Sequence, residues 1–292
     1  FMYNGRFEPK RELDLLHRYR ITTFCGPPTE YRMLIKENLS EYQFPALRHC
    51  TAAGEPLNPE VIEVWREHFK LTVHDGYGQT ESIILVANMP GMEIKPGSMG
   101  LPFPGHDVQV VNHELNESKI DEVGEVAVRV NPERPPSLFL EYWKNPQETS
   151  ASFRGDFYLT GDQAYRDADG YLWFVGRADD VIISAGYRIG PFEVESALLE
   201  HPAVLESAVV ASPDADRGSI VKAFVKVKDG IEASDALVHE LQEHVKRVTA
   251  PYKYPRKIEF IDELPKTVSG KIRRVELRRR EAEQRSEPQI KS

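Results

Sequence analysis

The chain has 292 residues and a net charge of -9, with 37 Lys and Arg against 46 Asp and Glu. This acidic balance disfavours nucleic acid as the main partner, because binding to a polyanionic duplex needs a dominant positive field. The length exceeds one ordinary core and predicts two domains, or one and a half. Every apolar run is short and interrupted by charges, so we expect no membrane span and no signal peptide. The chain opens on Phe1-Met2-Tyr3, and we expect it to be an excerpt of a longer protein.

Cys25 and Cys50 are the two cysteines, and both stand in apolar surroundings. No Cys-x-x-Cys or His-x-x-x-His spacing offers a metal cage. We interpret both as buried thiols in a reducing compartment.

The first 94 residues alternate helix and strand signals. The apolar periodicity predicts these elements in chain order: a helix over Pro9–Tyr19, a strand over 21–25, a helix over Thr29–Asn38, a helix over Pro59–Phe69 and a strand over 71–73. Such alternation is typical of an α/β layer with a largely parallel sheet.

From residue 95 the pattern changes to short alternating strands, such as 108–111 and 125–128, between Gly, Pro and Asn turns. It predicts a small β-barrel over 95–178. A third segment, 179–292, predicts a compact α+β domain with helices over 192–200 and 235–248 and with strands over 181–183, 206–211, 221–227 and 258–261. The expected fold class is therefore α/β plus α+β. We expect a large domain over 1–178, made of the layer 1–94 and the barrel 95–178, and a small mobile domain over 179–292.

Four polar motifs follow one another along the chain: Asp75-Gly76-Tyr77-Gly78-Gln79-Thr80-Glu81, Thr160-Gly161-Asp162, Gly176-Arg177-Ala178-Asp179-Asp180 and Pro265-Lys266-Thr267-Val268-Ser269-Gly270-Lys271. Each alone is weak, but the ordered set resembles the adenylate-forming superfamily of acyl-CoA synthetases, luciferases and peptide-synthetase adenylation domains. Ala185–Pro191 and Ala250–Lys257 resemble the medium-chain acyl-CoA synthetase branch in particular. The resemblance implies the adenylate-forming fold over nearly the whole chain.

The first motif carries side chains suited to a nucleotide. Gly76 and Gly78 allow close backbone approach, Tyr77 offers a ring for adenine, the Thr80 hydroxyl suits a phosphate oxygen, and Glu81 is a hard ligand suited to Mg²⁺. From the motif alone, a plain strand-to-loop turn is an equal alternative. The resemblance implies that these residues bind ATP together with Gly54, Glu55, Pro56, Asp75, Gln79, Asp162 and Arg177. Asp162 and Arg177 would contact the ribose.

The last motif implies the catalytic cation. By resemblance Lys271, in a mobile loop with Ser269-Gly270, bridges the substrate carboxylate and the α-phosphate, and with Thr80 and Glu81 completes the catalytic set. The resemblance makes Asp179 the hinge about which the small domain rotates. Two adjacent aspartates would stay hydrated in either pose, although a plain acidic turn is an open alternative.

The acceptor side is implied by the small domain. The resemblance assigns a thiol channel to Ala185, Gly186, Tyr187 and Arg188, and CoA nucleotide contacts to Arg217, Lys246, Tyr254, Pro255 and Arg256. The stretch 246–280 is basic and suits a polyanion such as CoA. Within it, we interpret Arg278-Arg279-Arg280 as a solvated helical face.

The resemblance thus implies an ATP-dependent acyl-CoA synthetase that uses ATP, Mg²⁺ and CoA on a medium-chain or aromatic carboxylic acid, in the cytoplasm or the mitochondrial matrix. One alternative is an adenylate former with a carrier protein or another acceptor. Another is an inactive nucleotide- or CoA-binding fragment, because the family's Thr/Ser/Gly-rich phosphate loop is not found in these residues. We therefore expect the isolated piece to be a poor catalyst. The sequence leaves the oligomeric state open.

Overall fold

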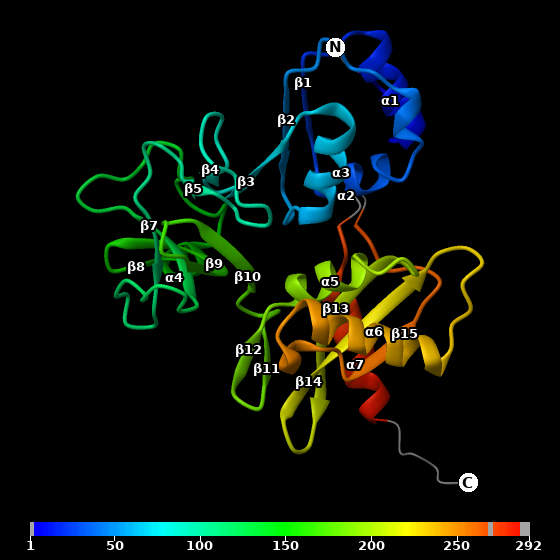
Figure 1. The fold of residues 1–292 in the computed structure, drawn as a ribbon. Helices are drawn as coiled ribbons and strands as arrows, with labels where there is room; N and C mark the ends of the chain where they lie inside the picture. Colours follow the sequence, from blue (N-terminus) through cyan, green and yellow to red (C-terminus); the bar gives the residue numbers. More distant parts are fainter. Residues whose placement is uncertain (1–2, 268–270, 287–292) are drawn as a thin grey trace. The chain divides into compact units, whose positions relative to one another are not determined.

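The N-terminal part of the chain joins helices to a mixed sheet (Figure 1). The computed structural model describes residues 3–267 and 271–286, and the chain divides into two units, Phe1–Phe174 and Val175–Ser292. The first sheet runs in the order β1 (Thr23–Gly26), β2 (His49–Ala53), β3 (Val73–Gln79), β4 (Ile83–Ala87), β5 (Leu101–Pro102). The strands β1, β2 and β3 are parallel, and β4 and β5 continue the sheet antiparallel. The predicted α/β layer is confirmed.

Helices α1 (Pro9–Arg18), α2 (Pro28–Leu34) and α3 (Pro59–Phe69), with a 3₁₀ turn η1 (Leu39–Glu41), accompany these strands. Each α-helix begins on a proline, whose fixed φ and missing N–H suit the first helical turn. The helix α2 is shorter than predicted, because the amides after it bond three residues back and tighten the chain into 3₁₀ turns.

The helices cover one side of the β1–β3 strands (Figure 1), where Tyr31 and Trp65 are fully buried. Along β1, Phe24 is buried and Cys25 is exposed. Successive strand residues point to opposite faces, so Cys25 faces away from the helices. The prediction of two buried thiols is confirmed for Cys50 and wrong for Cys25.

A second sheet follows in the same unit. Its elements are β6 (Val108–Val111), β7 (Gly124–Arg129), α4 (Pro146–Ser152), β8 (Phe153–Arg154), β9 (Phe157–Arg166) and β10 (Leu172–Arg177). The strand order is β10-β9-β7-β6, with β8 beside β9, which makes a half-barrel where the sequence predicts a barrel. Leu85 and Val86 of β4 share its core with Val126 and Tyr158. The β3–β4 hairpin therefore connects the two sheets.

The second unit is an α+β domain, as predicted. Its elements are β11 (Ile182–Ser184), β12 (Tyr187–Ile189), α5 (Pro191–Leu199), β13 (Val204–Asp214), β14 (Gly218–Val227), α6 (Asp235–Val248), η2 (Pro251–Lys253), β15 (Lys257–Phe260) and α7 (Arg274–Ser286). The sheet has the order β12-β11-β14-β13, with β15 parallel to β14. The helix α6 has its predicted bounds, and the Ser234 hydroxyl caps it by accepting from the Leu237 amide.

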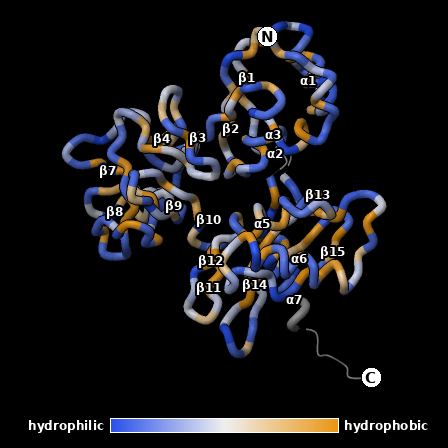
Figure 2. The backbone as a smooth tube through the Cα atoms, in the orientation of Figure 1, coloured by the Kyte–Doolittle hydropathy of each residue, from blue (hydrophilic) through white to orange (hydrophobic). Residues whose placement is uncertain are grey.

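Hydropathy differs sharply among the helices of this unit. Leu241 and Val245 of α6 are fully buried against sheet residues such as Val209 and Val221. In contrast, α7 is drawn largely in the hydrophilic colour (Figure 2). None of the helices in residues 3–267 and 271–286 combines the length and the apolar character that a bilayer crossing needs.

Candidate functional site

A buried carboxylate joins the first two polar motifs. The Asp162 Oδ2 atom accepts a hydrogen bond of 2.7 Å from the Tyr77 hydroxyl and another of 2.7 Å from the Gln79 amide. Tyr77 and Gln79 come from β3 of the first sheet and Asp162 comes from the middle of β9 in the second. Asp162 is 6% exposed. Burial and the neighbouring Asp162 charge both raise the pKa of the Tyr77 phenol, so this hydroxyl stays a donor.

Tyr158 and Thr160 complete this network, and sequence reasoning missed Tyr158. The Tyr158 hydroxyl donates to the Gln79 side-chain oxygen at 2.8 Å, and the Gln79 amide also donates to the Thr160 carbonyl at 2.9 Å. Gln79 therefore has both of its polar ends engaged and orients Asp162. No signal in the sequence pointed to Tyr158, because it lies within an ordinary apolar strand.

Gly78 allows the close approach of two protein strands. The strand β3 extends to Gln79 instead of ending at Val73, since Gly78 pairs with Ile84 of β4. A Cβ at Gly78 would lie 1.6 Å from the Ile83 carbonyl oxygen. The predicted reason for Gly78, close approach to a nucleotide, is thus not the first reason for a glycine there. Ile83 itself has φ 58°, which is unusual for a β-branched residue and marks a strained turn.

This strained turn holds Thr80 and Glu81. Glu81 accepts a hydrogen bond of 2.9 Å from the Tyr142 hydroxyl, and its carbonyl accepts one of 2.7 Å from the Phe139 amide. Two links to the segment 139–142 therefore fix the direction of the carboxylate. Among the described residues, no group of three or more His, Cys, Asp or Glu side chains could hold a metal ion. Glu81 would have to act as a single protein carboxylate ligand.

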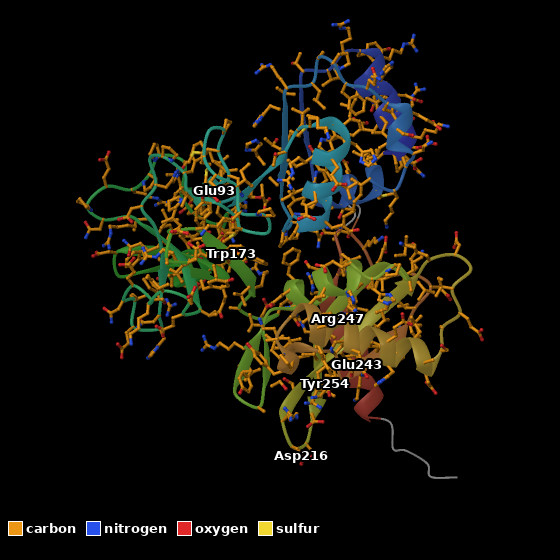
Figure 3. All side chains as sticks on the ribbon, viewed as in Figure 1. Glu93, Trp173, Asp216, Glu243, Arg247 and Tyr254 are labelled. Carbon is orange, nitrogen blue, oxygen red and sulfur yellow. The ribbon has the colours of Figure 1, made fainter. Side chains whose placement is uncertain are left out.

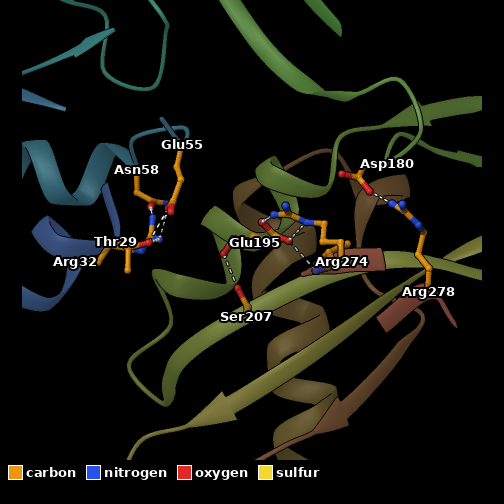
Figure 4. A network of polar contacts seen from close by, with 10 residues as sticks. Thr29, Arg32, Glu55, Asn58, Asp180, Glu195, Ser207, Arg274 and Arg278 are labelled. Carbon is orange, nitrogen blue, oxygen red and sulfur yellow. Dashed lines mark hydrogen bonds and ion pairs between the residues drawn. The ribbon is translucent and has the colours of Figure 1, made fainter. Parts of the chain in front are cut away.

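Two other predicted residues have carboxylates that are already engaged. Asp75 is 6% exposed and accepts a hydrogen bond of 3.0 Å from the Gly76 amide. Burial raises its pKa to about 7. Glu55 accepts from the Thr29 hydroxyl at 2.7 Å and from Arg32 at 2.9 Å (Figure 4). These contacts leave the backbone of the Gly54–Pro56 turn, beside Tyr77 through the pairing of β2 with β3, as the part available to a ligand.

In the second unit, the predicted hinge is an ordered turn. The Asp180 and Val181 amides both donate to the Arg177 carbonyl, at 2.9 and 3.1 Å. Arg177 is exposed and lies 3.7 Å from Asp179. Asp179 is exposed as well, but the Asp180 side chain is only 15% exposed and pairs with Arg278. The prediction that both aspartates stay hydrated is wrong for Asp180.

The predicted thiol-channel residues form the tip of the β11–β12 hairpin. Ala185 and Gly186 have φ of 49° and 86° and make a two-residue turn, with Tyr187 and Arg188 exposed beyond it. The Ala185 amide donates to the Arg217 carbonyl at 3.1 Å, which brings the β13–β14 turn beside the hairpin. A Cβ on Gly186 would meet nothing within 4 Å, so the space above the tip is open.

Aromatic rings and cations gather near this hairpin. The rings of Tyr187 and Tyr252 stack with centroids 4.3 Å apart. The Tyr254 ring lies between Lys246, 4.3 Å from its centroid, and Arg256, 4.9 Å from it. Figure 3 labels Tyr254 near α6 and Asp216 at the β13–β14 turn. Pro255 contributes its carbonyl to a hydrogen bond of 3.0 Å from Gln242. The structure thus assembles the predicted CoA residues from separate segments, and Tyr252 is an additional aromatic residue.

Lys271 has a fixed backbone and an exposed side chain. Its amide donates to the Thr267 hydroxyl at 3.1 Å, and its carbonyl accepts from the Thr267 amide at 2.8 Å. Lys266 and Ile272 pair antiparallel next to it. The predicted loop residues Ser269-Gly270 lie outside the described residues.

Comparisons with known proteins agree on one enzyme class. A model of AMP-binding enzymes matches residues 2–143, and a model of the AMP-binding enzyme C-terminal domain matches residues 193–271. The chain is 54% identical to acyl-coenzyme A synthetase ACSM3, mitochondrial, of Mus musculus, over 96% of this chain and 48% of the relative. It is 55% identical to the uncharacterized acyl-CoA ligase YtcI of Bacillus subtilis, over 96% of this chain and 53% of the relative. The crystal structure of the anthranilate CoA ligase AuaEII with anthranoyl-AMP matches with a TM-score of 0.87 and 36% identity, over 96% of this chain and 52% of that one. The chain spans about half the length of the curated relatives it matches.

Proposed function

This chain belongs to the AMP-binding enzymes of the adenylate-forming superfamily, and on that premise we propose that the protein containing it is an ATP-dependent acyl-CoA synthetase. Such an enzyme joins a carboxylate to ATP, releasing pyrophosphate and forming an acyl-adenylate. The thiol of CoA then displaces AMP and yields the thioester. We propose a medium-chain or aromatic carboxylic acid as the substrate, in keeping with the names of the similar acyl-CoA synthetase and anthranilate CoA ligase.

The buried Asp162 carboxylate is the observation that carries the proposal. Two donors hold one of its oxygens from the side of β3, Tyr77 and Gln79. A carboxylate oriented in advance can accept hydrogen bonds from both ribose hydroxyls without a reorganisation cost, which is the use that nucleotide-binding folds make of one. Tyr77, next to the Gly54–Pro56 turn, would supply a face for adenine.

The phosphates would lie toward the turn after β3. There the Thr80 hydroxyl would contact the α-phosphate. A magnesium ion would fit Glu81, because Mg²⁺ is commonly bound by one or two carboxylates together with substrate phosphates and waters. When bound, the ion would neutralise phosphate charge. The Tyr142 hydroxyl would orient the Glu81 carboxylate for that role.

The second unit would supply both the catalytic cation and the acceptor site. Lys271, exposed on a pinned backbone, would approach the carboxylate and the α-phosphate as a point charge. The hairpin tip at Gly186 would admit the pantetheine thiol. The cations around the Tyr254 ring would bind the CoA phosphates, and Arg177 would add a contact to the ribose. Rotation about Asp179 would exchange these two roles.

Several coarser features of the proposal follow from the relatives. One similar relative is named as mitochondrial and another comes from a bacterium, so we propose the matrix or the cytoplasm as the compartment. Because the chain covers about half of these relatives, we propose that it needs the remainder of the protein for turnover.

The test is to replace Lys271 by alanine in the full-length protein and to measure the two half-reactions separately. Acyl-adenylate formation is followed by pyrophosphate release, and thioester formation is followed from supplied acyl-adenylate and CoA. We expect adenylate formation to fall by about 100-fold or more, because a charge aimed at the reacting phosphate is lost, while thioester formation continues. Lys266→Ala is the matched control, since Lys266 lies in the same segment but pairs with Glu206. An equal loss of both half-reactions would contradict the assigned role.

A further inference from the structure

The last helix is held mainly by charges. Among the described side chains of α7, Leu277 is the buried apolar residue, and it packs with Ala208, Val210, Phe224 and Leu264. One apolar contact defines the position of a helix poorly, because it leaves both rotation and sliding open. The ionic contacts of α7 must therefore set its register.

Those ionic contacts follow one face of the helix. Arg274, Arg278 and Glu281 are spaced four and three residues apart, which places them on the same side of the helix. Arg274 binds both oxygens of Glu195, at 3.1 and 2.6 Å, and Glu195 is only 5% exposed (Figure 4). Glu281 pairs with the equally buried Lys222. Both ends of the face are therefore anchored in the small domain.

The middle residue of the face, Arg278, binds the hinge turn. Its guanidinium contacts Asp180, as Figure 4 shows, and lies 3.3 Å from Asp179. The two aspartates are consecutive residues, so one planar fork that holds both side chains also restrains the backbone torsions between them. The interpretation of Arg278 as part of a solvated face is therefore wrong, and Arg280 likewise pairs with Glu259.

The position of this turn gives the contact its significance. The boundary between the two units falls at Phe174 and Val175, and the Arg177–Val181 turn begins two residues later. A change in the path of the chain from the first unit to the second has to use torsions in this stretch. The same helix that carries Arg278 follows directly on the Lys271 segment. Arg278 thus connects the start of the second unit to the helix beside the proposed catalytic lysine.

We propose that Arg278 is a positioning residue that latches the hinge turn to α7 and so sets the balance between the adenylate-forming and the thioester-forming poses. The proposal rests on the proposed function, because it assumes two poses. Arg278 touches neither substrate nor reacting atoms in this role. Its effect is to make one path of the linker more stable than the others by the energy of its contacts with Asp179 and Asp180. A pose that needs another linker path has to break them.

The test uses Arg278→Gln, Asp180→Asn and the double variant in the full-length protein, with Arg279→Gln as the matched control because Arg279 is the exposed neighbour on the same helix. The first readout is amide hydrogen exchange at Asp180 and Val181, whose amides close the turn. We expect exchange there to speed up about fivefold or more in both single variants, and to stay unchanged in the control.

The second readout is the ratio of the two half-reaction rates. We expect both single variants to shift this ratio in the same direction by about fivefold or more. The double variant should shift it no further, because the second substitution removes a contact that is already lost. Arg278→Lys should restore part of the ratio, since it keeps the charge but loses the fork.

A merely structural role predicts a different pattern. Faster exchange with equal loss of both half-reactions, or shifts that add up in the double variant, would overturn the proposal. Unchanged exchange in Arg278→Gln would overturn it as well. Absence of acyl-adenylate formation in the unmodified protein would instead contradict the proposed function, and the exchange readout would still decide whether Arg278 holds the turn.

Discussion

The two proposed binding regions differ in how completely their side chains are engaged. Around Asp162 the polar groups are buried and bonded to one another, from Tyr158 through Gln79 to the carboxylate. Around the β11–β12 hairpin, Tyr187 and Tyr252 are 53% and 42% exposed, and the cations surround an accessible ring. The first region is preorganised by hydrogen bonds, and the second is a surface of stacked rings and charges.

This difference indicates where each region obtains its specificity. A buried network loses stability when one member is removed, because the remaining donors and acceptors are left without partners. An exposed stack loses only its own contact area and charge. Substitutions should therefore affect folding and nucleotide binding together in the first region and CoA binding alone in the second.

The largest expected effect concerns the buried carboxyl of Asp75. Its pKa of about 7 in the folded chain lies above the usual value of 3.8, because burial disfavours the charged form. The folded state thus binds this proton more tightly. The resulting stability is fully present below about pH 4 and is lost as pH rises through 7. Asp75→Asn should remove a loss on the order of 4 kcal/mol between pH 4 and 8.

Urea unfolding of the chain and of Asp75→Asn at several pH values measures that difference. Groups shared by both proteins cancel in the comparison. A difference in unfolding free energy that stays constant from pH 4 to 8 would show that Asp75 ionises normally.

Gly78→Ala should cost roughly 3 kcal/mol of unfolding free energy. The added Cβ would lie 1.6 Å from the Ile83 carbonyl oxygen, so the β3–β4 hairpin has to shift. Gly105→Ala is the control, since a Cβ there meets nothing within 4 Å and only its φ of 92° opposes the change. Thermal unfolding of both variants compares them, and equal losses would refute the close-approach explanation.

Asp162→Asn should raise the KM for ATP by about 100-fold, because each hydrogen bond between a carboxylate and a ribose hydroxyl loses its charge. Asp167→Asn serves as the control: Asp167 is held by Lys95 and by Trp173, which Figure 3 labels. Steady-state kinetics on the full-length protein give both values. A KM for ATP unchanged in Asp162→Asn would remove Asp162 from the nucleotide site.

Tyr252→Leu should have the smallest effect, a rise in the KM for CoA of about three- to tenfold with the KM for ATP unchanged. Its loss leaves Tyr187 without its stacking partner. Tyr19→Leu, a change of a similarly exposed tyrosine in the first unit, is the control. A parallel rise in both KM values would show that the stack supports the fold and not the acceptor site.

The sequence predicted those elements whose signals are local. The bounds of α3 and α6 followed from apolar periodicity and from Pro59 and Ser234 at their starts. The extension of β3 to Gln79 could not be read, because it depends on pairing with β4, whose register requires a glycine at 78. Exposure of Cys25 depends on which face of the sheet the helices cover.

The site was less accessible to such reasoning. Residue types near Tyr77 indicated a nucleotide, but the contact with Asp162 joins residues 85 positions apart and needs the fold. The resemblance to a family supplied that pairing. The Arg278 contact with Asp180 was missed, because a run of three arginines has the appearance of a solvated surface in the sequence.

One measurement tests the central claim most directly: the products formed by the full-length protein from ATP, CoA and a panel of acids from acetate to benzoate and decanoate. The account predicts acid-dependent formation of AMP, pyrophosphate and thioester in equal amounts, with medium-chain or aromatic acids preferred. Formation of ADP and phosphate, or no thioester with any acid, would contradict it.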